Sequence, residues 1–191
     1  GYLDFTDNLY IEYKPWDFIK FVGRVGINTK RTEDEEFYPA DHSKFIDDIN
    51  NTQDDVLLSR GTYDATNGKY TKLSADLSVQ VNKSFAGAHD LFLTGQYSVE
   101  TTNYSEVTHY TEGFPNSSMN SIIFARQYAT DRVPTGADGL NRSLGFLLTG
   151  GYSYKNRYMV DLTGKMSASS VFGTDNKWAN FWSLGLAWNL H

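Results

Sequence analysis

The sequence has no cysteine among its 191 residues and only four prolines. Without cysteine, the chain can form no disulfide scaffold, no thiol nucleophile and no cysteine-ligated metal site. No window approaches the roughly 18 consecutive apolar residues of a membrane-spanning helix. Basic residues are also scarce, 17 against 23 acidic ones, so the chain lacks the basic footprint of a nucleic-acid-binding protein. We therefore expect no nucleic acid among its partners.

Aromatic residues, in contrast, are plentiful, at 15% of the chain. Apolar residues as a whole make up 40%, which is below the usual level, and the mean hydropathy is −0.48. These values fit a soluble protein. They fit a membrane β-barrel equally well, because its strands alternate apolar and polar side chains and so have a low average hydropathy. The periodicity of the sequence has to decide between the two.

Alternation of apolar and polar residues recurs through most of the chain. In residues 158–168, for example, Tyr158, Val160 and Leu162 share one face, and Met159, Asp161 and Thr163 share the other. The pattern predicts about seven strands, most of them about 10–13 residues long, whereas globular strands average about five or six and tilted membrane strands need about 9–11. The predicted strands lie near residues 9–14, 19–28, 72–82, 91–100, 143–154, 158–168 and 178–190.

The predicted connections alternate in length. Short connections fall at residues 15–16, 83–89 and 155–157, and long ones at residues 30–69, 103–141 and 169–177. Short turns on one side and long loops on the other are typical of an up-and-down outer-membrane barrel, with short periplasmic turns and long extracellular loops. Within the first long loop, residues 43–50 could form a short helix.

The polar face carries mostly Ser, Thr, Gly, Ala, Asn and isolated charges, which suits a wet barrel wall. Aromatic residues gather at predicted strand ends, as in the girdles at a membrane interface. An odd number of long strands would leave unpaired edges, which are costly in lipid. We therefore expect residues 1–191 to be a single, incomplete β-barrel segment that lacks the remaining strands.

The last third of the chain resembles a known family. Residues 113–116 read Gly-Phe-Pro-Asn, and residues 151–161 contain a Tyr-x-Tyr-x-x-Arg-Tyr hairpin. Residues 169–178 read Ser-Ser-Val-Phe-Gly-Thr-Asp-Asn-Lys-Trp, and residues 181–188 end in Ala-Trp. In this order the motifs resemble the barrel of SusC/RagA-type TonB-dependent outer-membrane transporters. One departure is residues 164–168, where Gly-Lys-Met-Ser-Ala replaces a more charged stretch of the family.

The resemblance implies an all-β, antiparallel, up-and-down transmembrane barrel segment, seven strands out of about 22. It implies a function in the bacterial outer membrane, as part of an active importer of oligosaccharides or peptides. The implied partners are a SusD-like lipoprotein lid, TonB acting through a plug domain absent here, the lipid bilayer and the remaining barrel strands. Such a protein is not an enzyme and uses no cofactor.

Two other functions stay open from the residues alone. A soluble or secreted β-sandwich or barrel domain could bind carbohydrate, and it would bury Leu162, Leu184 and Leu186 in a core. A barrel enzyme of the outer membrane would need a convergent Ser, His and acid set, for which no motif is found. The four histidines are scattered and the acidic stretch of residues 33–55 does not match a calcium loop, so no metal site is predicted.

Two groups of residues are candidates for function. Charged side chains on the polar face are predicted to line the lumen: Lys20, Arg24, Lys72, Asp76, Glu100, Asp161 and Lys165. Aromatic side chains in the long central loop are predicted to contact substrate or the lid: Tyr104, Tyr110, Phe114, Phe124 and Tyr128.

Overall fold

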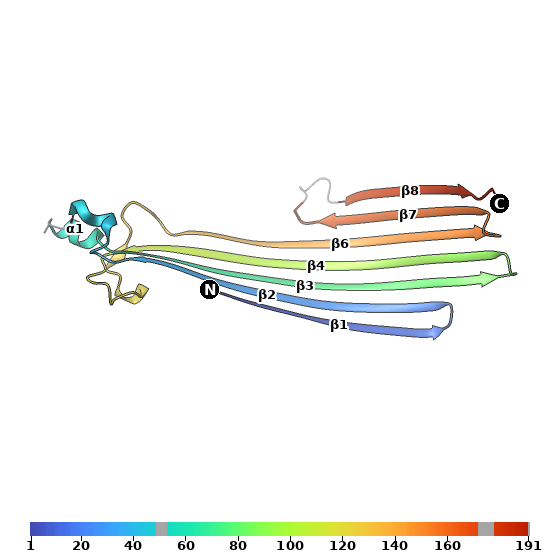
Figure 1. The fold of residues 1–191 in the computed structure, drawn as a ribbon, viewed down its shortest axis with the longest axis horizontal. Coiled ribbons are helices and arrows are strands. Elements are labelled where there is room, and N and C mark those ends of the chain that lie inside the picture. The colour runs from blue at the N-terminus through green and yellow to red at the C-terminus, as the bar shows by residue number, and fades with distance from the viewer. Residues whose placement is uncertain (49–52, 172–177, 191) are drawn as a thin grey trace. The chain divides into compact units, whose positions relative to one another are not determined.

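The structure, a computed structural model, consists almost wholly of long β-strands and describes residues 1–48, 53–171 and 178–190 (Figure 1). The strands are β1 (Tyr2–Trp16), β2 (Ile19–Tyr38), β3 (Thr62–Phe85), β4 (His89–Glu112), β5 (Gln127–Tyr128), β6 (Thr135–Tyr154), β7 (Tyr158–Ser169) and β8 (Trp178–Trp188). The helical segments are short: η1 (Ser43–Asp48), α1 (Asp54–Ser59) and η2 (Ile122–Phe124).

The strands form one antiparallel sheet in the order β1-β2-β3-β4-β6-β7-β8, and the two-residue β5 pairs with the end of β4. Each long strand therefore lies beside its neighbour in the chain, as Figure 1 shows. Within the described residues β1 and β8 are the two edges, and the sheet is open. The predicted all-β, up-and-down antiparallel class is confirmed.

The chain divides into two compact units, and several strands run from one into the other. Unit 1 comprises Gly1–Asp4, Thr29–Tyr70 and Tyr104–Gly139, and unit 2 comprises Phe5–Asn28, Thr71–Asn103 and Leu140–His191. The prediction of a single barrel domain over residues 1–191 stays a prediction.

Unit 2 contains part of each of the seven long strands and the three short turns. The turn after β3 has positive φ at Ala86 and Gly87, 53° and 62°, and the turn after β6 has positive φ at Lys155 and Asn156, 53° and 52°. Two consecutive residues with positive φ make a type I′ turn, whose twist matches that of the strands that it joins. The short connections predicted at residues 83–89 and 155–157 are thus confirmed, as tight hairpins. The one predicted at residues 15–16 is shifted, because Pro15 and Trp16 belong to β1 and residues 17–18 connect it to β2.

The register of the last three strands fixes which side chains share a face. Leu162 of β7 lies opposite Gly150 of β6 and Leu184 of β8. Tyr158 lies opposite Tyr154 and Trp188 at the turn end. Because side chains alternate along every strand, the predicted apolar and polar alternations become two continuous faces, which we call the apolar face and the polar face.

Unit 1 has a small core of its own. Phe114 is 1% exposed, and it packs with Tyr63 and Ala65 against the half-buried Phe37 and Ala125. The ring of Phe114 lies edge-on to that of Phe37, with centroids 5.4 Å apart.

Two glycines bring the chain into this core. Gly61 and Gly113 have positive φ, 74° and 86°, and Gly113 donates a backbone hydrogen bond of 3.0 Å to the Gly61 carbonyl. A Cβ on Gly113 would lie 2.8 Å from the Leu58 carbonyl oxygen, so the backbone approaches too closely for any side chain. Gly113 and Phe114 of the motif at residues 113–116 therefore contribute to the packing of the unit 1 core.

The predicted strand bounds were too short. β3 and β4 each have 24 residues, against a prediction of about 10–13. As a result residues 30–38, 62–69, 104–112 and 135–141, assigned to long loops, belong to strands. The sequence there is polar, with Thr, Glu and Tyr, and the pairing of neighbouring backbones continues without an apolar face to reveal it.

Two sequence predictions fall partly outside the described residues. Residues 172–177 of the Ser-Ser-x-Phe-Gly motif lie there, although the loop does end at Trp178 as predicted. The short helix predicted for residues 43–50 is observed as η1 at Ser43–Asp48, and residues 49–50 lie outside the described part.

Candidate functional site

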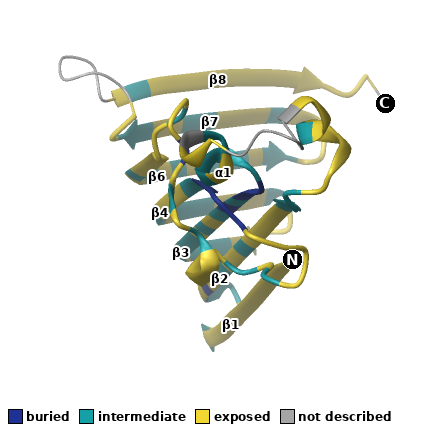
Figure 2. Ribbon diagram, turned by 90° about the vertical axis from the view of Figure 1, so that its left-hand side faces the viewer, coloured by how far each residue is buried: buried dark blue, intermediate teal, exposed yellow. Residues whose placement is uncertain are grey.

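The apolar face of unit 2 is exposed. Its apolar run covers nine residues on β3 (73–81) and eleven on β7 (158–168), which is the length of a tilted membrane strand. Figure 2 shows β8 exposed over nearly its whole length. Leu162, Leu184 and Leu186 are 50%, 57% and 74% exposed, so the burial that a soluble domain would require is not observed.

An aromatic belt lines the apolar face and its margin at the short turns. Trp16 stacks on Phe18, Phe85 stacks on His89, and Tyr158 stacks on Trp188. The His89 ring is joined to Tyr152 by a hydrogen bond of 2.6 Å between Nδ1 and the hydroxyl. Aromatic rings with a polar tip favour the interface between hydrocarbon and water. A belt of this kind is typical of the rim of a membrane β-barrel.

On the polar face, two of the predicted lumen residues pair with each other. Lys72 Nζ lies 2.8 Å from Glu100 Oε2 across β3 and β4. Lys20 instead pairs with Glu12 of β1 at 3.2 Å, and the Arg24 guanidinium lies 5.7 Å from the centroid of the Tyr10 ring. Each of these contacts joins side chains of two neighbouring strands of the sheet.

The other predicted lumen residues also lie on the polar face, at separate places along it. Asp161 lies opposite Gly151 and Gly185, and a Cβ on Gly151 would be 2.9 Å from its carboxylate. Lys165 lies opposite Leu147 and Phe181, and Asp76 lies on the polar alternation of β3. The seven side chains thus share a face and do not converge on a single point.

Sequence reasoning missed several partners on the polar face. Glu12 accepts contacts from Lys14 and Lys20 and a hydrogen bond from the Tyr10 hydroxyl. Asp90 accepts a hydrogen bond from Ser84 and lines, with Asp161, a hollow of about 430 Å³. The alternation of residues 10, 12 and 14 placed Glu12 on this face, but only the pairing of β1 with β2 brings Lys20 to it.

The five loop aromatics have different surroundings. Tyr104 and Tyr110 lie in β4, and the Tyr104 ring covers Gly139, where a Cβ would be 2.6 Å from the ring. Phe124 in η2 is 43% exposed and Tyr128 in β5 is 56% exposed. Phe114 is buried in the core of unit 1. A contact role for the four accessible aromatics stays a prediction.

Side chains that the sequence did not single out hold the central loop of unit 1 in place. Arg132 forms a two-pronged ion pair with Asp64, at 3.0 and 3.4 Å, and its guanidinium carbon lies 4.4 Å from the centroid of the Tyr110 ring. The buried carboxylate of Glu112 accepts hydrogen bonds from Gln127 Nε2 at 2.8 Å and from the Thr130 amide at 3.2 Å. The loop is thus a folded element.

The ionisation of unit 1 follows from these contacts. Burial raises the pKa of the Tyr63 hydroxyl to about 12, and its hydrogen bond to Glu35 adds to the shift. A hydrogen bond to the Glu36 carboxylate likewise raises the pKa of Tyr38.

Within residues 1–48, 53–171 and 178–190, no three His, Asp or Glu side chains gather as a metal site. No helix in that part of the chain is long and apolar enough to cross a membrane.

Comparisons with known proteins agree with the motifs. The chain is 24% identical to TonB-dependent receptor P3 of Formosa agariphila over 186 residues, 96% of this chain and 17% of that receptor. It is 26% identical to TonB-dependent receptor P39 of the same organism over 110 residues, 57% of this chain and 10% of that receptor. The chain thus spans less than a fifth of these relatives. No protein-family model matches the chain.

Among solved structures, the fold matches that of the RagAB peptide transporter. The TM-score is 0.80 over 97% of this chain and 19% of that one, at 16% identity. The same importer in its open-open state gives a TM-score of 0.79. The homologues and the fold confirm the resemblance to the barrel of a SusC/RagA-type TonB-dependent transporter.

Proposed function

We propose that this chain is a wall segment of an outer-membrane TonB-dependent importer, which takes up oligosaccharides or peptides together with a SusD-like lipoprotein. The observation that carries the proposal is the exposed apolar face, whose runs are nine to eleven residues long and end in an aromatic belt. A band of this height matches the hydrocarbon core that a tilted β-strand crosses. Relatives described as TonB-dependent receptors support the same function.

The remaining parts of the proposal follow from the sheet and from the relatives. β1 and β8 are long edge strands, and unpaired backbone in lipid costs several kcal/mol per group. Further strands therefore complete the barrel, and energy reaches it from TonB through a plug domain. The charged polar face then lines the lumen or meets the plug. The protein moves its substrate unchanged, so it is a transporter and no enzyme.

The lipid-facing geometry can be tested on two neighbouring residues of β8. In the full-length protein, reconstituted in vesicles, a nitroxide label replaces Leu184 on the apolar face or Ser183 on the polar face. We expect the label at Leu184 to collide with oxygen, which concentrates in lipid, and the label at Ser183 to collide with a water-soluble nickel complex. Equal access of the nickel complex to both would favour a secreted carbohydrate-binding domain.

Import is tested in cells that carry the full-length protein. Uptake of labelled oligosaccharide and oligopeptide mixtures is measured with and without TonB and with and without the lipoprotein that copurifies in mild detergent. We expect uptake of one mixture to be lost without TonB. Uptake that is unchanged without TonB would refute active import.

A further inference from the structure

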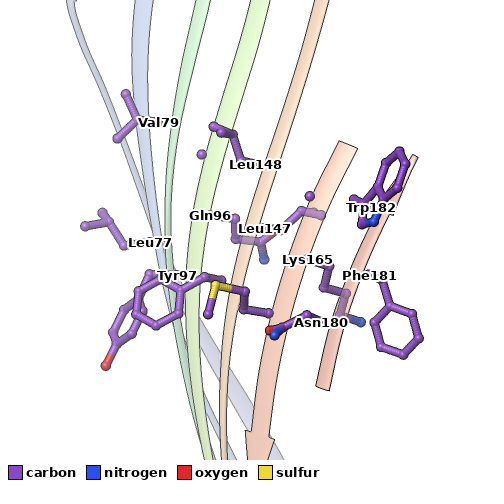
Figure 3. A pocket seen from close by; sticks show the side chains of 14 residues that line it. Leu77, Val79, Gln96, Tyr97, Leu147, Leu148, Lys165, Asn180, Phe181 and Trp182 are labelled. Atoms are coloured by element: carbon purple, nitrogen blue, oxygen red, sulfur yellow. The ribbon is translucent and has the colours of Figure 1, made fainter. Parts of the chain in front are cut away.

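The apolar face contains a hollow over β4, β6 and β7, which we call the glycine groove, and Leu148 of β6 lies opposite Gly164 in it. Gly95 and Gly164 have no side chain, and no heavy atom lies within 4 Å of the place where a Cβ would stand. The groove encloses about 660 Å³, and outward side chains such as Leu148, Tyr97 and Trp182 form its walls (Figure 3). Since neither glycine is required by crowding, each leaves open a space that a larger residue would fill.

The groove leads to a positive charge. A second hollow, of about 360 Å³, lies further along the same strands, and its lining includes Leu144, Ala168, Ser170 and Arg142. Glu100 also lines it, and its carboxylate pairs with Lys72. Arg142 is exposed, and no carboxylate of the described residues lies within 4.0 Å of its guanidinium. Its backbone is fixed, because the Arg142 amide and carbonyl each hydrogen bond to Ser170 at 2.8 Å. The guanidinium of Arg142 thus lies at the end of the apolar surface that these two hollows follow.

The length of this path corresponds to one leaflet of a membrane. Six residues separate Gly164 from Ser170, which is about 20 Å along a strand at 3.3 Å per residue. At a tilt of about 45° this becomes about 14 Å of depth, close to half of the ~30 Å hydrocarbon core. Tyr158, with the aromatic belt, lies six residues from Gly164 in the opposite direction. Gly164 therefore lies near the midplane, and Arg142 lies at the level of the outer headgroups.

We propose that the glycine groove binds one anionic lipid of the outer leaflet, with an acyl chain along Gly95 and Gly164 and a phosphate on Arg142. This inference rests on the proposed membrane function. The charge complementarity selects the occupant, because a guanidinium pairs with phosphate through two parallel hydrogen bonds and the apolar path has the length of an acyl chain. An apolar protein surface would leave Arg142 unmatched.

The test is native mass spectrometry of the full-length protein, delipidated in mild detergent and titrated with lipid. The two probes are phosphatidylglycerol and phosphatidylcholine with identical acyl chains. We expect one phosphatidylglycerol to bind in preference. Arg142→Gln should weaken its binding by about tenfold or more, the scale of one charge-assisted hydrogen-bonded pair. Arg31→Gln, which removes another exposed cation of the apolar alternation, is the matched control and should leave binding unchanged.

A second pair of variants tests the groove itself. Gly164→Phe should abolish the selective binding, whereas Val160→Phe, on the same face of β7 but outside the groove, should not. Heat-modifiable gel migration confirms that each variant is folded, and Gly95→Phe serves if Gly164→Phe does not fold. Equal binding of both lipids, or binding untouched by both Arg142→Gln and Gly164→Phe, overturns the proposal. So does a protein dimer that Gly164→Phe dissociates.

The same preparation separates the two proposals. A protein that inserts into vesicles but shows no lipid preference refutes the lipid site and leaves the importer standing. A protein that remains in solution without detergent refutes both.

Discussion

At the scale of single residues, the glycines of this chain do two opposite things. Gly113 has positive φ, and a Cβ there would lie too close to the backbone of residue 58. Gly95 and Gly164 lie in extended strands, and a Cβ on either would have no heavy atom within 4 Å. The first kind is required by the backbone, and the second kind shapes a surface. The same residue type therefore predicts different outcomes for substitution.

Gly113→Ala should destabilise the fold of unit 1. A side chain with φ near 86° is strained, and its Cβ would lie 2.9 Å from that of Arg126. We expect a cost of about 1–3 kcal/mol. Limited proteolysis of the full-length protein in vesicles measures it as faster cleavage within residues 113–134. Gly23→Ala, where nothing lies within 4 Å, is the control and should be cleaved as the parent is. Equal cleavage of both variants would contradict the structure.

The Tyr63 hydroxyl gives unit 1 a sensitivity to high pH. Its pKa is about 12 in the fold against an ordinary value of 10.0, so the folded state holds the proton more tightly. The resulting stability is fully present below pH 10 and is lost as the pH rises from about 10 to about 12. Tyrosinate absorbance after a pH jump should show a tyrosine that titrates near pH 12 and that is missing in Tyr63→Phe. A Tyr63 that titrates near pH 10 in the folded protein would contradict this.

At the scale of strands, the two faces predict opposite responses to charge. Leu162 lies two residues from Gly164, near the proposed midplane, and Thr163 next to it points to the polar face. Leu162→Arg should destabilise the folded protein in lipid by about 2–4 kcal/mol. Thr163→Arg should cost much less, because its side chain meets water.

Reversible unfolding of the full-length protein in lipid vesicles by denaturant measures both changes. Equal costs at Leu162 and Thr163 would mean that the two faces have the same surroundings, which would rule out a bilayer on one side.

At the scale of the whole molecule, the tryptophans of β8 can test the proposed depth of the strands in a membrane. Trp182 lies opposite Gly164, and Trp188 lies opposite Tyr158 in the aromatic belt. Lipids brominated near the ends of their acyl chains should quench Trp182, and lipids brominated near the headgroup should quench Trp188. The variants Trp182→Phe and Trp188→Phe each remove one of these signals. The reverse order of depths would overturn the placement of the bilayer.

The sequence by itself determined the strands, the two faces and the tight turns. Alternation in residues such as 158–168 is a local property, because neighbouring side chains of a strand point to opposite sides whatever lies beside them. For the same reason the aromatic belt and the seven charges of the polar face could be predicted. The motifs of residues 113–188 resemble those of a SusC/RagA-type barrel, and they are read from the sequence alone.

Only the tertiary structure decided how far the strands extend and which residues meet. The polar ends of β3 and β4 are strands because their neighbours pair with them, and the sequence there carries no apolar period. The core around Phe114, the ion pair of Lys20 with Glu12 and the glycine groove each bring together residues that are far apart in the sequence. Such contacts depend on register, and register is set by the whole sheet.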